Sequence, residues 1–162
     1  MNPNELLTGG YRMACRLVHM MCDDLTAEEF RHQPVPGANS AAWVVGHLAI
    51  TARRFADRLG TADLPALTDE FLGRFNTTKK AAEEQPDLGD KAELLALFDL
   101  CMEKLSTALA ALPVEMLNNP PPSITVKPAN LGEALLFGSM HVAMHCGQIS
   151  TIRRSLGKPP AV

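Results

Sequence analysis

The sequence of 162 residues predicts an all-α fold, a four-helix bundle formed by a single domain over residues 1–162. Apolar residues recur at helical spacing along nearly the whole chain, and period-two alternation is almost absent. Three of the four long helical segments also begin at a capping residue and stop at Gly or Pro. The length suits one domain with its own hydrophobic core and is too short for two ordinary domains.

The first two helices are predicted in the N-terminal third of the chain. The first runs from about Asn4 to Asp23, and the second begins at the N-cap Ser40, reaches about Leu59 and stops at Gly60. The residues expected on the apolar stripe of the first helix are Leu6, Met13, Leu17 and Met20 or Met21.

The third and fourth helices are predicted over residues 90–112 and 130–156, where Pro113 and Gly157 follow their ends. Each begins with the signature of a capping box, in which a capping residue is followed three positions later by Glu. The two pairs are Asp90 with Glu93 and Asn130 with Glu133. A further short helix is expected over residues 68–75, in the long connection between the second and third helices.

Composition argues against several classes of partner. The net charge of −3 and the pI of about 5.9 give no electrostatic reason for binding nucleic acid or an anionic membrane. No apolar run is long enough for a membrane span, and the N-terminus lacks the pattern of a signal peptide. The four cysteines form no CxxC pair, so reduced thiols in a cytoplasmic protein are expected.

Three histidines fall on predicted interior faces. His141 and His145 are four residues apart, so they share one face of the fourth helix, and that face is apolar. Two such imidazoles are either neutral and hydrogen-bonded within the core or chelate a metal together. His47 lies on the interior side of the second helix, and facing helices of a bundle can build a metal site from inward side chains.

Three imidazoles suit zinc, nickel, copper or ferrous iron. They leave one or more coordination positions open for water or substrate, which is typical of a catalytic site rather than a structural one. A carboxylate base beside the histidines is missing from the sequence, and Asp23 and Asp24 are the obvious candidates from elsewhere. Without a base, such a metal acts mainly as a Lewis acid or lowers the pKa of a bound water or thiol.

Two groups of residues carry a family resemblance. The first group leads into and follows the second helix and comprises Pro34, Pro36, Gly37, Asn39, Ser40, Trp43, Gly46, His47 and Leu48. The second group lies on the last helix and comprises His141, His145, Gly147, Gln148, Ile149, Arg153 and Arg154. In order and spacing they resemble the DinB/YfiT-like superfamily, which is unrelated to the DNA polymerase that shares the first name.

The resemblance covers essentially the whole chain, and it implies an up-down-down-up bundle that is often dimeric. By position, it makes His47, His141 and His145 the ligands of one divalent metal ion, with zinc, nickel and iron as candidates. Thiol-dependent S-transferases and isomerases belong to this superfamily. The resemblance therefore implies a homodimeric enzyme that acts on a small molecule together with a low-molecular-weight thiol.

Several other residues allow two interpretations. Gln148 either hydrogen-bonds a ligand imidazole or packs between helices, and Gly147 is expected where a neighbouring helix comes close. Arg153 and Arg154 either receive an anionic substrate group or are solvated. The residues expected to play no part in the site are His19, His32 and Cys146.

Three functions remain open on the sequence alone. The first is a metal-dependent transferase acting with a thiol, and the second is a metal-dependent hydrolase. The third is a non-catalytic, stress-associated protein that binds a metal or another ligand. The sequence reveals neither the native metal nor the substrate.

Overall fold

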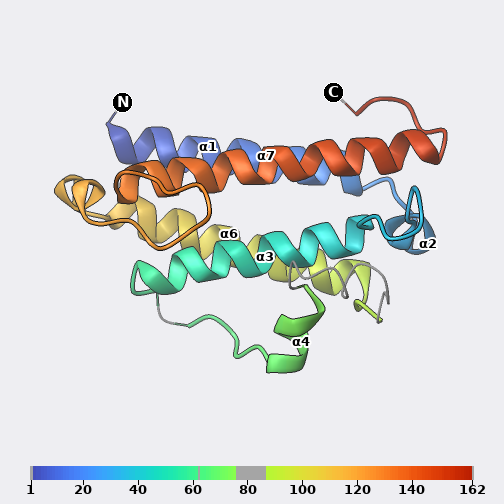
Figure 1. Cartoon of the computed structure of the whole chain (residues 1–162), viewed down its shortest axis with the longest axis horizontal. Coiled ribbons are helices and arrows are strands. Elements are labelled where there is room, and N and C mark those ends of the chain that lie inside the picture. Colours follow the sequence, from blue (N-terminus) through green and yellow to red (C-terminus); the bar gives the residue numbers. More distant parts are fainter. Residues whose placement is uncertain (1, 62, 76–86, 162) are drawn as a thin grey trace.

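Four long helices lie along a common axis in the computed structural model, which describes residues 2–61, 63–75 and 87–161 (Figure 1). They are α1 (Pro3–Cys22), α3 (Ala41–Arg58), α6 (Lys91–Ala111) and α7 (Leu131–Ser155). Helices α1 and α7 run side by side in one direction, and α3 and α6 run side by side in the other (Figure 1). The described part of the chain contains no strand, so the predicted all-α, up-down-down-up bundle is confirmed.

Three short helical segments complete the described structure. Helix α4 (Asp69–Arg74) confirms the short helix predicted between the second and third long helices. Helix α2 (Ala27–Arg31) lies between α1 and α3, and the 3₁₀ helix η1 (Val114–Asn118) lies between α6 and α7. The sequence analysis did not predict these two, because five residues are too few to show helical periodicity.

The predicted helix starts are confirmed by their caps. The side chains of Ser40, Asp90 and Asn130 each accept a hydrogen bond from a backbone N–H in the first turn of α3, α6 and α7. At Asn130 the predicted capping box is altered, since the Glu133 carboxylate accepts from the N–H of residue 129 instead of residue 130. Complete capping boxes occur at the starts of α1 and α2, where Asn2 pairs with Glu5 and Thr26 with Glu29.

The inner face of α1 differs from the prediction. Leu6, Met13 and Met20 are 63%, 66% and 52% exposed, whereas Met21 is buried and Leu17 is partly buried. The residues of α1 that are buried in the core are Leu7, Tyr11, Ala14, Val18, Met21 and Cys22. The buried face is therefore rotated about one residue, or roughly 100°, from the predicted stripe.

Tyr11 explains part of this rotation. Its hydroxyl donates a hydrogen bond to the carbonyl of Leu135 on α7 at 2.8 Å, so an aromatic ring with a polar tip is fully accommodated in the core. Gly138 makes room for it, because a β-carbon at that position would lie 2.0 Å from the Tyr11 hydroxyl oxygen. This close approach joins α1 to α7 near the middle of the bundle.

Candidate metal centre

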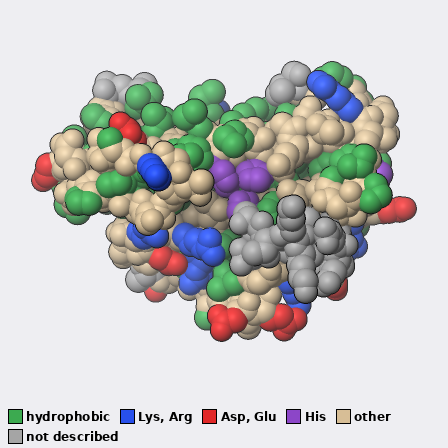
Figure 2. Space-filling view, viewed as in Figure 1, with side chains coloured by type: hydrophobic (Ala, Val, Ile, Leu, Met, Phe, Trp, Pro, Cys, Tyr) green, Lys and Arg blue, Asp and Glu red, His purple; other side chains and the backbone are tan. Residues whose placement is uncertain are grey.

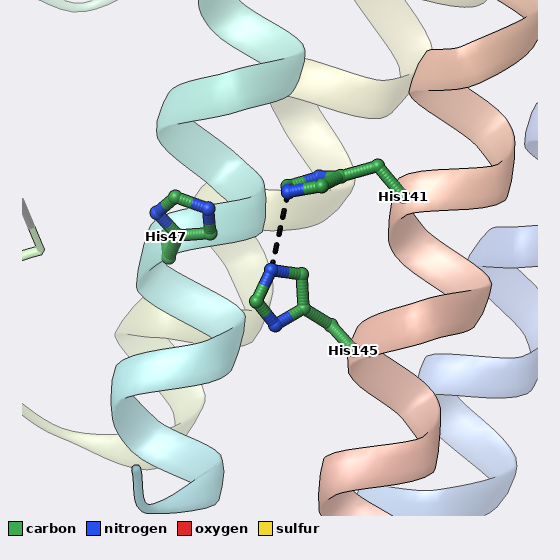
Figure 3. Close-up of side chains that lie close together, drawn as sticks. All are labelled: His47, His141 and His145. Atoms are coloured by element: carbon green, nitrogen blue, oxygen red, sulfur yellow. Dashed lines mark hydrogen bonds between the residues drawn. The ribbon is translucent and has the colours of Figure 1, made fainter. Parts of the chain in front are cut away.

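Three imidazoles meet between α3 and α7 (Figure 3). His47 projects from α3, and His141 and His145 project from successive turns of α7 toward it. One ring nitrogen from each histidine lies within 4.8 Å of the others. The Nε2 atoms of His141 and His145 are 3.1 Å apart. The structure thus brings together all three histidines that the sequence analysis singled out.

The outer nitrogens of two rings are held by acceptors. Nδ1 of His47 lies 3.2 Å from the backbone carbonyl oxygen of Phe75, which can only accept a hydrogen bond. Nδ1 of His145 lies 3.1 Å from the side-chain oxygen of Gln148, which also accepts from the Asn39 amide at 3.3 Å. Both Nδ1 atoms therefore carry the proton, and both Nε2 atoms present a lone pair.

The residues next to His47 fix its ring. Trp43, one turn earlier on α3, stacks on the imidazole with ring centroids 4.8 Å apart and an interplanar angle of 7°. Gly46 lets Phe75 approach, because a β-carbon at position 46 would lie 2.1 Å from the Phe75 ring. Gly46 therefore leaves room for Phe75, and the Phe75 carbonyl in turn orients the His47 ring.

All three imidazoles are kept neutral. Burial lowers the pKa of His47 and of His141 to about 4, and burial also lowers the pKa of His145. The proximity of the other imidazoles lowers the first two further. Because a metal binds the neutral ring, protons do not compete with it at neutral pH.

His141 shows that this arrangement suits a cation. Its Nδ1 is buried and has no hydrogen-bond partner among the described residues, while its Nε2 faces the Nε2 of His145. If Nδ1 carries the proton, two lone pairs confront each other at 3.1 Å. If Nε2 carries it, Nδ1 is left as an unsatisfied buried acceptor. A divalent ion that accepts the facing lone pairs removes the first problem, so the three residues fit a metal.

An open pocket of about 380 Å³ adjoins the histidines. The residues that line it include Phe55, Phe137, Thr51 and Arg54, beside His47 and His141. Figure 2 shows histidine side chains reaching the surface near the middle of this face of the molecule. A small molecule can therefore reach the site from solvent and would meet apolar walls and one cation.

Comparison with known protein families identifies the family of this chain. The DinB superfamily matches residues 11–149 of the chain. The chain belongs to the DinB superfamily. A solved structure, that of a conserved protein from Enterococcus faecalis, superposes on this DinB protein with a TM-score of 0.76 at 19% sequence identity. The match covers 98% of this chain and 99% of the other and shows a shared fold; no curated protein matches the sequence.

Other residues considered at the sequence level have different positions in this DinB protein. His32 lies 3.0 Å from the Ser155 hydroxyl, away from the site, and Cys146 is buried in the core, as expected. Gly147 is exposed, and a β-carbon there would meet no described atom within 4 Å. The prediction that a neighbouring helix of the chain approaches Gly147 was therefore wrong.

Three of the charged residues that the sequence analysis considered for the site, Arg153 and the aspartates Asp23 and Asp24, make their contacts at one end of the bundle instead. Arg153 is only 5% exposed and donates to the Asp24 carboxylate and to the carbonyl of Met21, so it joins the end of α7 to the end of α1. It is not a receptor for substrate. Asp23 accepts from His19 at the same end of the bundle, so neither aspartate serves as a base beside the three histidines.

Three contributors to the site were missed by sequence reasoning. Phe75 acts through a backbone carbonyl, which leaves no mark in a sequence, and it comes from beyond α4. Asn39 was noted only as part of the motif before α3. Arg54 lies seven residues after His47, two helical turns along the same face, and that spacing could have placed it beside the site.

Proposed function

We propose that His47, His141 and His145 hold one divalent metal ion and that the protein is a metal-dependent transferase acting on a low-molecular-weight thiol. The observation that carries the proposal is the convergence of three neutral imidazoles, with one ring nitrogen of each within 4.8 Å of the others, beside an open pocket. Zinc, nickel and ferrous iron are the candidate ions, since imidazole suits all three.

A metal at this position supplies Lewis acidity, which favours the thiolate form of a thiol reaching the pocket. The chain's own residues supply the rest. Phe55 and Phe137 give apolar walls that exclude water around an electrophile, and Arg54 can bind a carboxylate of either reactant. In the transfer, a sulfur–carbon bond forms as the bond to the leaving group breaks, and the thiol proton passes to solvent.

The hydrolase alternative has less support. Metal-dependent hydrolases commonly use a carboxylate base beside the ligands, and the described residues lining this pocket include neither Asp nor Glu. The non-catalytic alternative is a stress-associated metal or ligand carrier. A single measurement distinguishes it from the transferase. The metal-loaded transferase consumes a thiol together with an electrophile such as monochlorobimane, and a carrier does not.

Substitution of the histidines tests the assignment. His141→Ala and His145→Ala should each remove the metal ion of this cluster, which elemental analysis after desalting measures as a loss of one ion per chain. His32→Ala is the matched control, because His32 lies outside the cluster and its Nε2 lies 3.0 Å from the Ser155 hydroxyl. Equal metal content in the wild type and in His145→Ala would refute the site.

We also propose that the protein is a homodimer that pairs through α1 and α7. The exposed face of α1 carries Leu6, Met13 and Met20 at seven-residue spacing, and that of α7 carries Leu136, Met140 and Met144. Residues 134–152 of α7 include no charged side chain, although this helix has a solvent-facing side. Figure 2 shows hydrophobic side chains along the edge formed by these two helices.

Gly147 supports the same interface. It lies on the exposed side of α7 and has free space around it, so no contact within the described chain requires a glycine there. A glycine in a helix costs about 1 kcal/mol relative to alanine, and close approach of a partner helix would account for it. A second copy is the natural partner, because α1 and α7 present the same apolar surface in each chain.

The free cysteines support a proposal for the cellular location of the protein. Cys15, Cys22, Cys101 and Cys146 are all free, which suits a reducing compartment, and we propose a cytoplasmic location. No helix among the described residues has the length and hydropathy to cross a lipid bilayer.

A further inference from the structure

A second group of metal-binding side chains lies between α1 and α6, a different pair of helices from the one that carries the three histidines. Cys15 and His19 are four residues apart on α1, and Asp99 faces them from α6. One donor atom from each of the three lies within 4.8 Å of the others. These residues play no part in the function proposed above.

The distances within this group are close to those of a tetrahedral zinc site. Asp99 Oδ1 lies 3.7 Å from the sulfur of Cys15 and 2.7 Å from Nε2 of His19. Ligand bonds of about 2.0 Å to nitrogen or oxygen and about 2.3 Å to sulfur place tetrahedral ligand atoms roughly 3.3 to 3.6 Å apart. The sulfur–oxygen pair, at 3.7 Å, is about 0.1 Å beyond this range, and the nitrogen–oxygen pair would need to open by about 0.6 Å.

The ring of His19 is already oriented for such a role. Its Nδ1 lies 2.9 Å from the carboxylate of Asp23, one turn further along α1, while Nε2 points at Asp99. A histidine that binds a metal commonly donates its other N–H to a carboxylate, which fixes the ring and raises its basicity. Asp23 would hold that position here.

The charge around the cluster favours a cation. Asp23 and Asp99 face His19 from two sides, and they raise its pKa, chiefly through the hydrogen bond to Asp99. Arg12 and Glu103, on the neighbouring wall, carry opposite charges. An ion would take the place of a proton between Nε2 of His19 and Oδ1 of Asp99, which lie 2.7 Å apart.

Access to the cluster is open. Cys15 and Asp99 form part of the wall of a pocket of about 500 Å³ between α1 and α6. His19 and Asp99 side chains are 32% and 46% exposed, so an ion can enter without unfolding the bundle. A fourth coordination position would face this pocket.

We propose that Cys15, His19 and Asp99 form a second metal site, selective for a borderline ion such as zinc, with Asp23 positioning His19. One thiolate, one imidazole and one carboxylate suit zinc and cobalt better than the hard ions magnesium and calcium. Binding displaces the thiol proton of Cys15 and the Nε2 proton of His19 to solvent, and no oxidation or reduction takes place.

Cobalt(II) titration of the full-length protein tests the proposal, because sulfur bound to cobalt gives an intense charge-transfer absorption in the near ultraviolet and imidazole does not. The wild type should bind two equivalents and develop this absorption. Cys15→Ser should lose the absorption and bind one equivalent. Cys101→Ala is the matched control, since its sulfur is buried in the core, and it should keep both.

Two further variants separate this site from the histidine cluster. His141→Ala/His145→Ala should keep the sulfur absorption at one equivalent, and Asp23→Asn should weaken cobalt binding about 10- to 100-fold while keeping the absorption. Cys15→Ser should retain any thiol-transfer activity. A wild type that binds only one equivalent without the absorption, or an absorption that persists in folded Cys15→Ser, would overturn the second site and leave the first unaffected.

Discussion

The aromatic ring of Phe75 occupies the space that a β-carbon at Gly46 would need, at 2.1 Å. Because the Phe75 carbonyl accepts the proton of His47 Nδ1, this contact links a backbone position of α3 to the orientation of His47, a proposed metal ligand. We expect Gly46→Ala to displace Phe75 and weaken metal affinity about 10- to 100-fold, the usual effect of removing an acceptor behind a ligand. Competition with a chromogenic chelator measures it.

Gly73→Ala is the matched control for the Gly46→Ala experiment. Gly73 lies in α4, and a β-carbon there would meet nothing within 4 Å among the described atoms. Gly73→Ala should leave metal affinity unchanged and should stabilise the protein slightly, by up to about 1 kcal/mol, because alanine is the better helix former. Equal metal affinity in both variants would contradict the role assigned to Phe75.

Gln148 should raise the metal affinity of the histidine cluster without being required for metal binding. Gln148→Ala removes the acceptor that holds His145, so the affinity of the histidine cluster should fall about 10- to 100-fold while the cluster still fills at saturating metal. Gln148→Glu keeps an acceptor and makes it anionic, so it should bind at least as tightly as the wild type. A Gln148→Ala variant with wild-type affinity would make Gln148 a packing residue only.

Removal of the metal should leave the bundle folded. The core of this chain is extensive, and it does not depend on the three histidines for its burial. Chelation should leave the helical circular-dichroism signal largely unchanged and lower stability only by the loss of bound ligand, about 3 to 4 kcal/mol at metal concentrations 100 to 1,000 times Kd. A collapse of the helical signal would make the metal structural and would remove the main support for an enzyme.

The proposed dimer can be disrupted from α1 alone. Met13→Asp places a charge in the centre of the exposed apolar face, so light scattering should change from about twice the 17.5 kDa chain mass to one chain mass. Val114→Asp is the control, because Val114 is also exposed but lies on η1. A wild type that scatters as a single chain at micromolar concentration would refute the dimer.

The Asp24–Arg153 pair predicts a specific dependence of stability on pH. The hydrogen bond and charge of Arg153 lower the pKa of Asp24 below its usual value. A carboxyl whose pKa is lower in the folded state stabilises it fully above the unfolded pKa of about 4, and the contribution is lost as the pH falls through the folded pKa. Asp24→Asn should therefore be less stable than wild type at pH 7, and the urea midpoints of the two proteins should converge as the pH falls below the folded-state pKa of Asp24.

Helix positions were predictable because their signals are local. Ser40, Asp90 and Asn130 cap the helices that the sequence assigned to them, and the left-handed glycines Gly60 and Gly157 follow the ends of α3 and α7. The inner face of α1 was not predictable in the same way. Which side of an amphipathic helix is buried depends on its neighbours, and Tyr11 is buried where the predicted stripe had placed Met13 on the inner face.

The candidate site was likewise predictable only in part, because its histidines have a local signal in the sequence and the partners of those histidines do not. His141 and His145 share a turn spacing that is visible in the sequence, and helix α3 brings His47 to them. The partners that orient the rings come from distant segments, such as Phe75 and Asn39, and depend on tertiary packing. The Cys15, His19 and Asp99 cluster was missed for the same reason, since Asp99 joins it from another helix.

The separation of His47 from His141 and His145 along the chain has a consequence for biosynthesis. Helix α3 leaves the ribosome long before α7, so an emerging chain carries one imidazole of the cluster until its last described helix has been made and has docked. A single imidazole holds a divalent ion weakly, and three converging ones hold it far better. Tight binding of the ion at the histidine cluster would then begin only after α7 has docked. The time course of metal binding by pulse-labelled chains would therefore report when folding is complete.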